Sequence, residues 1–534
     1  MSTDDINIRP AQFGDVEAVR DLFVAAYGQA YPFKQFYDVA WLRHAVYDDA
    51  TVFLVAEGTE GILGTISAML SAGDLSDLIG EFGRLVVHPA ARGRDVGTRL
   101  FQAAAEHVAR GIHFGFAEAR TAHAGSQKIL ERIGFAPIGF QPLKYALGAR
   151  ESMAMYGRLF GAAREQRRNH PRLIAEAAPL AMAALSGLEL PADVIVVDDE
   201  AGFPGTVSED ERPSRRVEIE DLSEQGWSPL LRIERGRVRG RDLYGNLSLA
   251  HGFFKIRTDA TRYLVAREGG NIVGGLGLTH DPVDRKVRFF ELIGLDDEIK
   301  GRLLGQAERL ARETLQAAYV EADVSAYAPA IQRTLERMGF MAVVYGPSMV
   351  FENVERLDVV RMAKLIIPYF HEDIPLTAAA DGMRELVERA MADRRDGAAV
   401  AVAAGASALF RGLLEGDMYH LARLGRLLAL EPGARLLRRG DAGDRVFIVV
   451  SGSMRAEADG AELGRVAPGE TVGEMALLDA GPRSADVVAV ERTTLVEFRR
   501  DELMTLMDQR PRIGAAVMRN FAALLAARLR RAQS

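Results

Sequence analysis

The chain has 534 residues, 48% hydrophobic and 26% charged, with a formal net charge of −8 and no cysteine. This length predicts several globular domains, since one domain takes roughly 150 residues, and the lack of cysteine excludes disulfides, thiolate metal sites and a cysteine nucleophile. The acidic balance, the polar start MSTDDINIRP and the lack of a bilayer-length apolar run predict a cytoplasmic protein with no membrane partner, no nucleic-acid partner and no metal site.

Residues 1–150 alternate strand and helix patterns. We expect strands at 6–9 and from residue 80 to Pro89, a hairpin over 51–70 with its turn near 58–61, and helices at 15–26, 97–110 and 125–133. Such alternation predicts an α/β domain.

The stretch RLVVHPAARGRDVGTRL, beginning at Arg84, places a turn between a strand and a helix. The first amides of that helix favour an anion. Gly93 and Gly97 allow close backbone approach, and Arg92 and Arg94 supply charge for phosphates. The pattern predicts a phosphate-binding turn, although plain surface turns have similar sequences.

With this turn, residues 5–148 resemble the GNAT acetyltransferase superfamily, whose R/Q-x-x-G-x-G/A loop holds the coenzyme A pyrophosphate. Arg92 and Gly97 match the outer fixed positions, and Asp95 replaces the middle glycine. The resemblance implies acetyl-CoA as co-substrate, with a fold that has lost its ligand as the alternative. The implied coenzyme site consists of Val87, Arg92, Gly93, Arg94, Val96, Gly97, Thr98 and Ser126.

The resemblance also implies a catalytic carboxylate on the strand before the loop. Glu81 is the candidate base, and an ordinary strand carboxylate is the alternative. The family often has a tyrosine acid four residues before the Gly-Phe pair, where this chain has Leu130. The acid is therefore missing or supplied by Ser126, Tyr145, His123 or solvent.

An internal repeat follows. YLVAREGGNIVGGLGL, from Tyr263, resembles FLVAEGTEGILGTIS, from Phe53, and TLERMGF, from Thr334, resembles ILERIGF, from Ile129. The shared order predicts a duplicated domain over 216–353, although common helix-end chemistry could produce the same matches.

The phosphate turn does not recur in this second copy. IGLDDEIKGRLL has Asp296, Asp297 and Glu298 in its place, and their charge would repel a diphosphate. We therefore expect a degenerate, non-catalytic GNAT-like domain that shapes the substrate groove or the packing between domains.

Two connecting regions are expected to be helical linkers, 151–215 and 354–406. Helical patterns cover 153–185, 354–365 and 383–392; an acidic linker covers 198–216 and a spacer covers 396–408. The last domain, 407–534, begins with a helical pattern and continues as short β-runs between Gly- and Asp-containing turns. This spacing predicts a small antiparallel barrel or jelly roll, closed by a helix over 512–530.

The stretch GEMALLDAGPRSA, from Gly473 to Ala485, resembles the phosphate-binding cassette of cyclic nucleotide-binding domains. Arg483 can form forked hydrogen bonds to a cyclic phosphate, Glu474 can accept from the ribose 2′-OH, and Ser484 adds a donor. The implied site is Gly473, Glu474, Met475, Ala476, Arg483, Ser484 and Ala485. Cyclic AMP is favoured over cyclic GMP; a domain that has lost its ligand is the alternative.

The expected fold class is α+β and multidomain, with two GNAT-like α/β domains before a β jelly-roll cyclic nucleotide-binding domain with flanking helices. The combination resembles bacterial cyclic AMP-regulated protein lysine acetyltransferases. It implies an N-acetyltransferase whose acceptor is a protein lysine. The alternatives are a small-molecule amine acceptor and a non-catalytic sensor. No helix-turn-helix pattern follows the last helix, so we do not expect a DNA-binding regulator. The sequence leaves the oligomeric state open.

Overall fold

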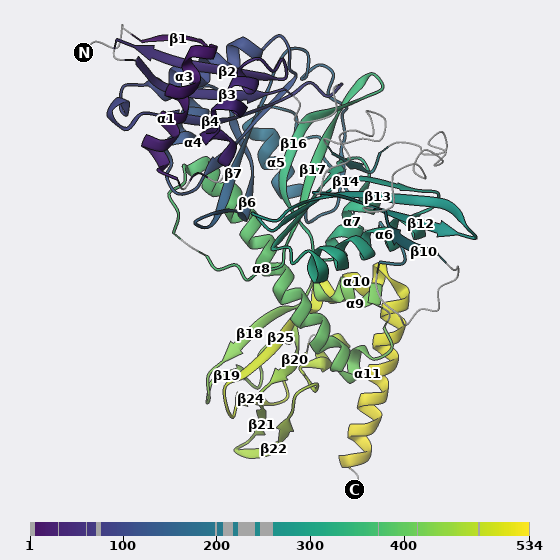
Figure 1. Ribbon diagram of the computed structural model, residues 1–534. Helices are drawn as coiled ribbons and strands as arrows, with labels where there is room; N and C mark the ends of the chain where they lie inside the picture. The colour runs from purple at the N-terminus through teal and green to yellow at the C-terminus, as the bar shows by residue number, and fades with distance from the viewer. Residues whose placement is uncertain are drawn as a thin grey trace. The chain divides into compact units, whose positions relative to one another are not determined.

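The computed structural model describes residues 6–29, 31, 33–59, 61–70, 76–197, 200–206, 217–222, 241–245, 260–371, 373–413, 415–478 and 481–532. The chain divides into two compact units, unit 1 (Met1–Glu388) and unit 2 (Arg389–Ser534) (Figure 1). Among the described residues, no helix combines the length and hydropathy needed to cross a bilayer.

The first half of unit 1, residues 6–159, is a sheet with helices on both faces. Its strands, in sheet order, are β1 (Asn7–Pro10), β2 (Thr51–Gly58), β3 (Gly61–Met69), β4 (Ile79–Val87), β5 (Phe114–Arg120), β7 (Ala149–Leu159) and β6 (Ala136–Leu147). Its helices are α1 (Val16–Tyr27), α2 (Val39–Val46), α3 (Val96–Val108) and α4 (Gly125–Arg132). The expected hairpin at 51–70 and all three expected helices are confirmed.

The second half of unit 1, residues 217–365, repeats the strand order of the first half, and its strands run across the sheet in the opposite direction. Its strands run β16 (Met341–Glu352), β17 (Glu355–Leu365), β15 (Tyr319–Ser325), β14 (Lys286–Gly294), β13 (Asn271–Asp281), β12 (Thr261–Glu268) and β10 (Glu218–Asp221), with β11 (Leu243–Tyr244) beside β15. Its helices are α6 (Asp297–Arg309) and α7 (Pro329–Arg337). Among the described strands, each half has one parallel pair, β4 with β5 and β14 with β15. The repeated sequence segments therefore occupy equivalent strands and helices.

The two halves join through β6 and β16 into one 15-stranded sheet. The join is made at Gly139, which pairs with Val344. A Cβ at Gly139 would lie 2.2 Å from the Val343 carbonyl oxygen, so only glycine permits this approach. The segment between the halves, β8 (Arg172–Leu173), α5 (Ala178–Gly187) and β9 (Ile195–Val196), packs α5 against both β6 and β16.

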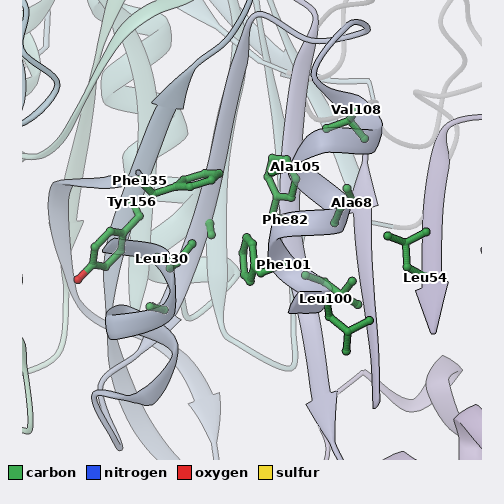
Figure 2. Close-up of a cluster of buried hydrophobic side chains, with 14 of the residues drawn as sticks. Leu54, Ala68, Phe82, Leu100, Phe101, Ala105, Val108, Leu130, Phe135 and Tyr156 are labelled. Carbon is green, nitrogen blue, oxygen red and sulfur yellow. The ribbon is translucent and has the colours of Figure 1, made fainter. Parts of the chain in front are cut away.

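The core of the first half lies between the sheet and α3 and α4. Phe82, Phe101 and Phe135 stack or meet edge to face with ring centroids 5.4–5.9 Å apart (Figure 2). Leu130 on α4 points into the same cluster and is 1% exposed. The burial of these aromatic and aliphatic side chains holds α3 against β2, β3 and β4.

Three sequence expectations are wrong in secondary structure. The regions expected as helical linkers, 151–215 and 354–406, begin with strands: 149–159 is β7, and 355–365 is β17. Both strands lie inside the sheet and are buried on both faces, so their near-continuous apolar runs lack the alternation that marks a strand. The expected spacer at 396–408 is mostly helix, because its alanines continue α8 (Ala378–Ala406). Most of the expected linker 198–216 lies outside the described residues.

Unit 2 contains two four-stranded antiparallel sheets. Their orders are β18 (Arg426–Leu430), β25 (Thr493–Arg499), β20 (Arg445–Ser451) and β23 (Thr471–Val472), and β19 (Arg435–Leu437), β24 (Asp486–Ala489), β21 (Met454–Ala458) and β22 (Ala461–Val466). Its helices are α9 (Glu415–Ala422), α10 (Arg500–Gln509) and α11 (Pro511–Ala532), with the later part of α8. The helical pattern expected at the beginning of the last domain, over Leu409 to Leu430, is confirmed only at α9, since 426–430 is β18. The expected final helix is confirmed as α11.

Candidate functional site

The turn between β4 and α3 adopts an unusual backbone. Gly93 has φ 79° and Asp95 has φ 59°, both in the left-handed region that favours glycine. A Cβ at Gly93 would meet no atom within 4 Å, so this exposed backbone is open to a ligand. Asp95 occupies the position where the resemblance expects glycine, and its φ gives the physical reason for that glycine.

The start of α3 is not capped by a side chain. Asp95 is the N-cap residue, but its carboxylate forms no cap hydrogen bond and pairs instead with Arg132, 3.1 Å away. Arg92 is exposed and Arg94 half-buried, and neither forms an ion pair with another described residue. Uncapped amides beside two such arginines fit a diphosphate.

Gly97 has a role that the sequence did not indicate. It is buried, and a Cβ there would lie 3.1 Å from Ile129 Cδ1 and 3.7 Å from Val87 Cγ2. Its missing side chain thus lets α3 approach α4 and the end of β4. Val96 and Thr98 are also buried, and Ser126 lies half-buried in the first turn of α4. The structure therefore brings Val87 and residues 92–98 together around the α3 start, and Ser126 lies on α4, whose Ile129 packs near Gly97.

β4 and β5 diverge beside this turn. Their pairing covers Ile79 to Phe82 opposite Phe114 to Ala117, whereas β4 continues to Val87 and β5 to Arg120. Among the described residues, no strand pairs with 118–120 on the side facing β4. Unpaired strand edges can hydrogen-bond an extended ligand, so the opening fits the arm of a coenzyme.

Glu81 lies on β4 in the last part that pairs with β5, opposite Phe116 and one residue before this opening. Its Oε1 accepts a hydrogen bond from Arg84 Nη2 at 2.7 Å, and its side chain is one-third exposed. Arg84 has φ 55°, a backbone conformation that costs energy in a residue other than glycine. The arrangement provides a carboxyl group with solvent access and an orientation set by Arg84.

The acid candidates differ in their surroundings. Leu130 is a core residue, and the hydroxyl of Tyr145 donates to Glu118 Oε2 at 2.7 Å. Burial and the charge of Glu118 raise the pKa of Tyr145 well above its usual range, so it stays protonated. His123 Nδ1 accepts from the Gly125 amide at 3.3 Å and stabilises the turn before α4.

A buried charge cluster, which the sequence did not indicate, joins the halves of unit 1. Lys144 lies 2.6 Å from Glu118 Oε1 and 3.2 Å from Glu321 Oε2, and Arg361 bonds Asp323 at 2.7 Å and 3.0 Å. These five side chains come from β5, β6, β15 and β17. No local pattern marks them, because the partners are far apart in the sequence.

In the second half, the start of α6, which corresponds to the open α3 turn, is covered by other residues of unit 1. Asp296 is the N-cap residue of α6, and its carboxylate accepts from the Ile299 amide at 2.9 Å. Residues 203–206 lie against α6, since a Cβ at Gly301 would be 2.0 Å from the Pro204 carbonyl oxygen. The α6 start is therefore capped, acidic and covered.

β11 fills the opening between β14 and β15. Leu243 and Tyr244 pair with Val324 and Asp323 of β15. These two residues follow the last β15 residue that pairs with β14, and β11 contacts both strands. Asp242 also pairs with Lys300 on α6 at 2.6 Å. The equivalent position in the first half is the opening between β4 and β5.

In unit 2, Arg483 is buried against backbone oxygens. Its Nη1 donates to Gly473 O at 3.2 Å and its Nη2 donates to Arg445 O at 2.8 Å. Its Nε is buried without a hydrogen-bond partner, and among the described residues no carboxylate forms an ion pair with it. Burial lowers the pKa of Arg483, although Asp444 and Glu474 oppose the shift. A buried guanidinium in this state fits an anionic ligand.

Gly473 makes this placement possible. It has φ 77°, and a Cβ there would lie 2.5 Å from Arg483 Nη1. A cavity of about 300 Å³ borders Arg483, with apolar sides from Leu437 and Phe447. Its other charged lining residues are Arg435, Arg438, Asp441, Asp444 and Arg445. Of the seven predicted nucleotide residues, only Arg483 lines this cavity.

The other predicted residues lie on either side of Arg483. Glu474 and Ala476 are buried in a short 3-10 helix, η11 (Glu474–Leu477), whereas Met475 and Ser484 are exposed and Ala485 is half-buried. Residues 479 and 480 of the cassette lie outside the described residues.

Comparison with known proteins identifies the two domains in which these regions lie. Residues 49–137 match the acetyltransferase (GNAT) domain family, and residues 427–510 match the cyclic nucleotide-binding domain family. The chain thus contains a GNAT acetyltransferase domain, which includes Glu81 and the α3 turn, and a cyclic nucleotide-binding domain, which includes Arg483.

Curated relatives match only in part. The cyclic AMP receptor protein of Thermus thermophilus is 42% identical over 105 residues, 19% of this chain and 47% of that protein. A cyclic nucleotide-gated potassium channel of Mesorhizobium japonicum is 36% identical over 106 residues, 20% of this chain and 29% of that protein. The crystal structure of the Thermus thermophilus catabolite activator protein is 37% identical, covering 24% of this chain and 60% of that one, with a TM-score of 0.22. The chain spans less than two thirds of each.

Proposed function

We propose that this protein is a cytoplasmic N-acetyltransferase regulated by cyclic AMP, with a protein lysine as acceptor. The observation that carries the proposal is the pairing of two anion sites in one chain. One is the uncapped α3 start beside Arg92 and Arg94, and the other is the buried Arg483. Each lies within the domain family that implies its ligand.

Acetyl-CoA supplies the acetyl group as a thioester. The α3 amides with Arg92 and Arg94 would hold its diphosphate, and the edges of β4 and β5 would hold its arm. Glu81, oriented by Arg84, would take a proton from the acceptor ammonium, because only the neutral amine is nucleophilic. Solvent or Ser126 would return a proton to the leaving thiolate, since Leu130 is buried and Tyr145 is bonded to Glu118.

We propose that the second half binds no coenzyme and acts as a scaffold. Asp296 already accepts from the Ile299 amide, one of the amides that a phosphate would need, and β11 occupies the strand edge that a coenzyme arm would need. The second half would support the first through β16 and the buried charge cluster.

A non-catalytic sensor is the second candidate. The observation that favours it is the lack of a tyrosine acid, since Leu130 belongs to the core. A small-molecule amine remains the alternative acceptor, since nothing in the α3 turn distinguishes a free amine from a lysine side chain.

Calorimetry with acetyl-CoA and cyclic AMP tests the proposal. Wild type should bind both, and Arg483→Leu should weaken cyclic AMP roughly 10- to 100-fold, because it removes charged hydrogen bonds. Arg483→Lys, which keeps the charge but not the fork, should fall between them. Acetyl-CoA affinity without nucleotide should stay the same in both variants. Wild type that binds no acetyl-CoA at millimolar concentration contradicts the enzyme, and wild type that binds no cyclic AMP contradicts the regulation.

A further inference from the structure

The helix α8 belongs to both units. Its first residues, up to Glu388, lie in unit 1 and the remainder lies in unit 2. Ala380 is part of the first-half core with Leu100 and Leu130. Val400, Ala403 and Ala404 are part of the unit 2 core. One continuous helix is thus packed into the core of each unit.

At its start, α8 is hydrogen-bonded to α4 through Thr377, the residue before its first turn. The Thr377 amide donates to Gln127 Oε1 at 3.0 Å, and the Thr377 hydroxyl donates to Glu131 Oε1 at 2.5 Å. The Tyr156 hydroxyl donates to the same Glu131 oxygen at 2.9 Å. Gln127 follows Ser126 on α4, so this bonded junction lies one residue from the proposed coenzyme site.

At its other end, α8 shares a core with the nucleotide cassette. Leu477, the last residue of η11, packs in the same cluster as Val400 and Ala403. Gly473, at the start of η11, accepts from Arg483. Arg500 at the start of α10 donates to Ala476 O at 2.6 Å, which ties η11 to the same helices. An anion that draws Arg483 from Gly473 would act on η11, which shares its core with α8 through Leu477.

We propose that α8 couples the two sites and that Thr377 is the position through which nucleotide binding alters acetyl-CoA affinity. The inference rests on the proposed function, because it assumes both ligands. The hydroxyl of Thr377 fixes the first turn of α8 to α4, and a shift of α8 then moves the turn that carries Ser126. A ligand changes a distant affinity only when it favours one of two arrangements, and α8 provides an element that both ligands can bias.

The test measures acetyl-CoA affinity with and without saturating cyclic AMP. In wild type the two values should differ by about 5-fold or more, the usual range of such couplings. Thr377→Val keeps the side-chain shape and removes the hydroxyl, so it should bring the ratio close to one. Acetyl-CoA affinity without nucleotide, and cyclic AMP affinity without coenzyme, should both match wild type.

Two further variants make the result decisive if Thr377→Val fails to fold. Tyr156→Phe removes the second bond to Glu131 and should reduce the ratio in the same direction. Ala392→Pro interrupts α8 at an exposed position between Ala380 and Val400, with Ala392→Gln as the matched control that keeps the helix. Proline should abolish the coupling and glutamine should preserve it.

Failure of this inference differs from failure of the proposed function. If wild type shows the coupling and both Thr377→Val and Ala392→Pro retain it, α8 is not the coupling element, although the regulated enzyme stands. If wild type binds both ligands with no coupling, cyclic AMP does not act on coenzyme affinity and the inference falls. If wild type binds no acetyl-CoA, both fall.

Discussion

Single residues in the α3 turn show how backbone conformation and charge can conflict. Asp95 takes a left-handed φ of 59°, which glycine adopts without strain, and it places a carboxylate beside the amides proposed to bind a diphosphate. Its partner Arg132 is 66% exposed, so the ion pair is screened by water and does little to offset that repulsion.

Replacing Asp95 should therefore strengthen coenzyme binding. Asp95→Asn removes the charge and should tighten acetyl-CoA binding roughly threefold. Two unit charges about 6 Å apart in water interact by about 0.7 kcal/mol, which corresponds to that factor. Asp95→Gly also removes the side chain and should tighten it further. Calorimetry measures both, with cyclic AMP affinity as the control. Unchanged or weaker binding in both variants would show that the diphosphate lies elsewhere.

Among the secondary-structure elements, equivalent strands leave an opening in the first half of unit 1 and a closed surface in the second half. In the first half, β4 and β5 separate beside an uncapped helix. In the second half, β11 closes the same opening, and Asp296 caps the helix. The close approach of β11 depends on Gly245, where a Cβ would lie 2.3 Å from Phe290 Cβ. A short strand and one capping residue thus separate an open site from a closed one.

This difference predicts the stoichiometry. Each chain should bind one acetyl-CoA, because, within the part of the chain that the structure describes, the first half alone offers uncapped amides beside an unpaired strand edge. Calorimetry or equilibrium dialysis at saturating coenzyme measures the number. Arg92→Glu with Arg94→Glu should reduce binding from one to none, since both changes repel the diphosphate. A value near two in wild type would show that β11 is displaced by coenzyme.

At the scale of the whole molecule, the buried charge cluster ties the halves of unit 1 together. Burial raises the pKa of Asp323, but Arg361 and Arg288 outweigh it and lower the value to about 2. The pKa of Glu118 is also lowered, because the charges of Lys144 and Arg361 exceed the effect of burial. Both carboxylates are thus charged in the folded protein at neutral pH. Glu118 attracts Arg361 across the halves, whereas Asp323 pairs with Arg361 and Arg288 within the second half.

The cluster should make unit 1 sensitive to acid. Because its folded pKa is lower than the unfolded value of 3.8, Asp323 stabilises the fold above that pH by about 2 kcal/mol. The contribution is lost as the pH falls from about 4 towards 2. Urea unfolding followed by tryptophan fluorescence measures it, since both tryptophans fall within residues 1–388.

Asp323→Asn is the variant that isolates this contribution. It should be less stable than wild type at pH 7 and should show a weaker pH dependence between pH 4 and 2. An equal pH dependence in both proteins would mean that the charge of Asp323 does not stabilise the folded state.

Local patterns in the sequence were enough to predict many of the secondary-structure elements, and resemblance to known families was enough to predict the two ligand motifs. Strand and helix periodicity located β2, β3, α3 and α4, and the cassette spacing located Arg483, because these signals act over neighbouring residues. The tertiary structure alone decided that β7 and β17 are strands, because burial on both faces removes the alternation that marks a strand. It also decided the contacts of Lys144 with Glu118 and Glu321, of β11 with β15, and of Thr377 with Glu131, since each brings together residues far apart in the chain.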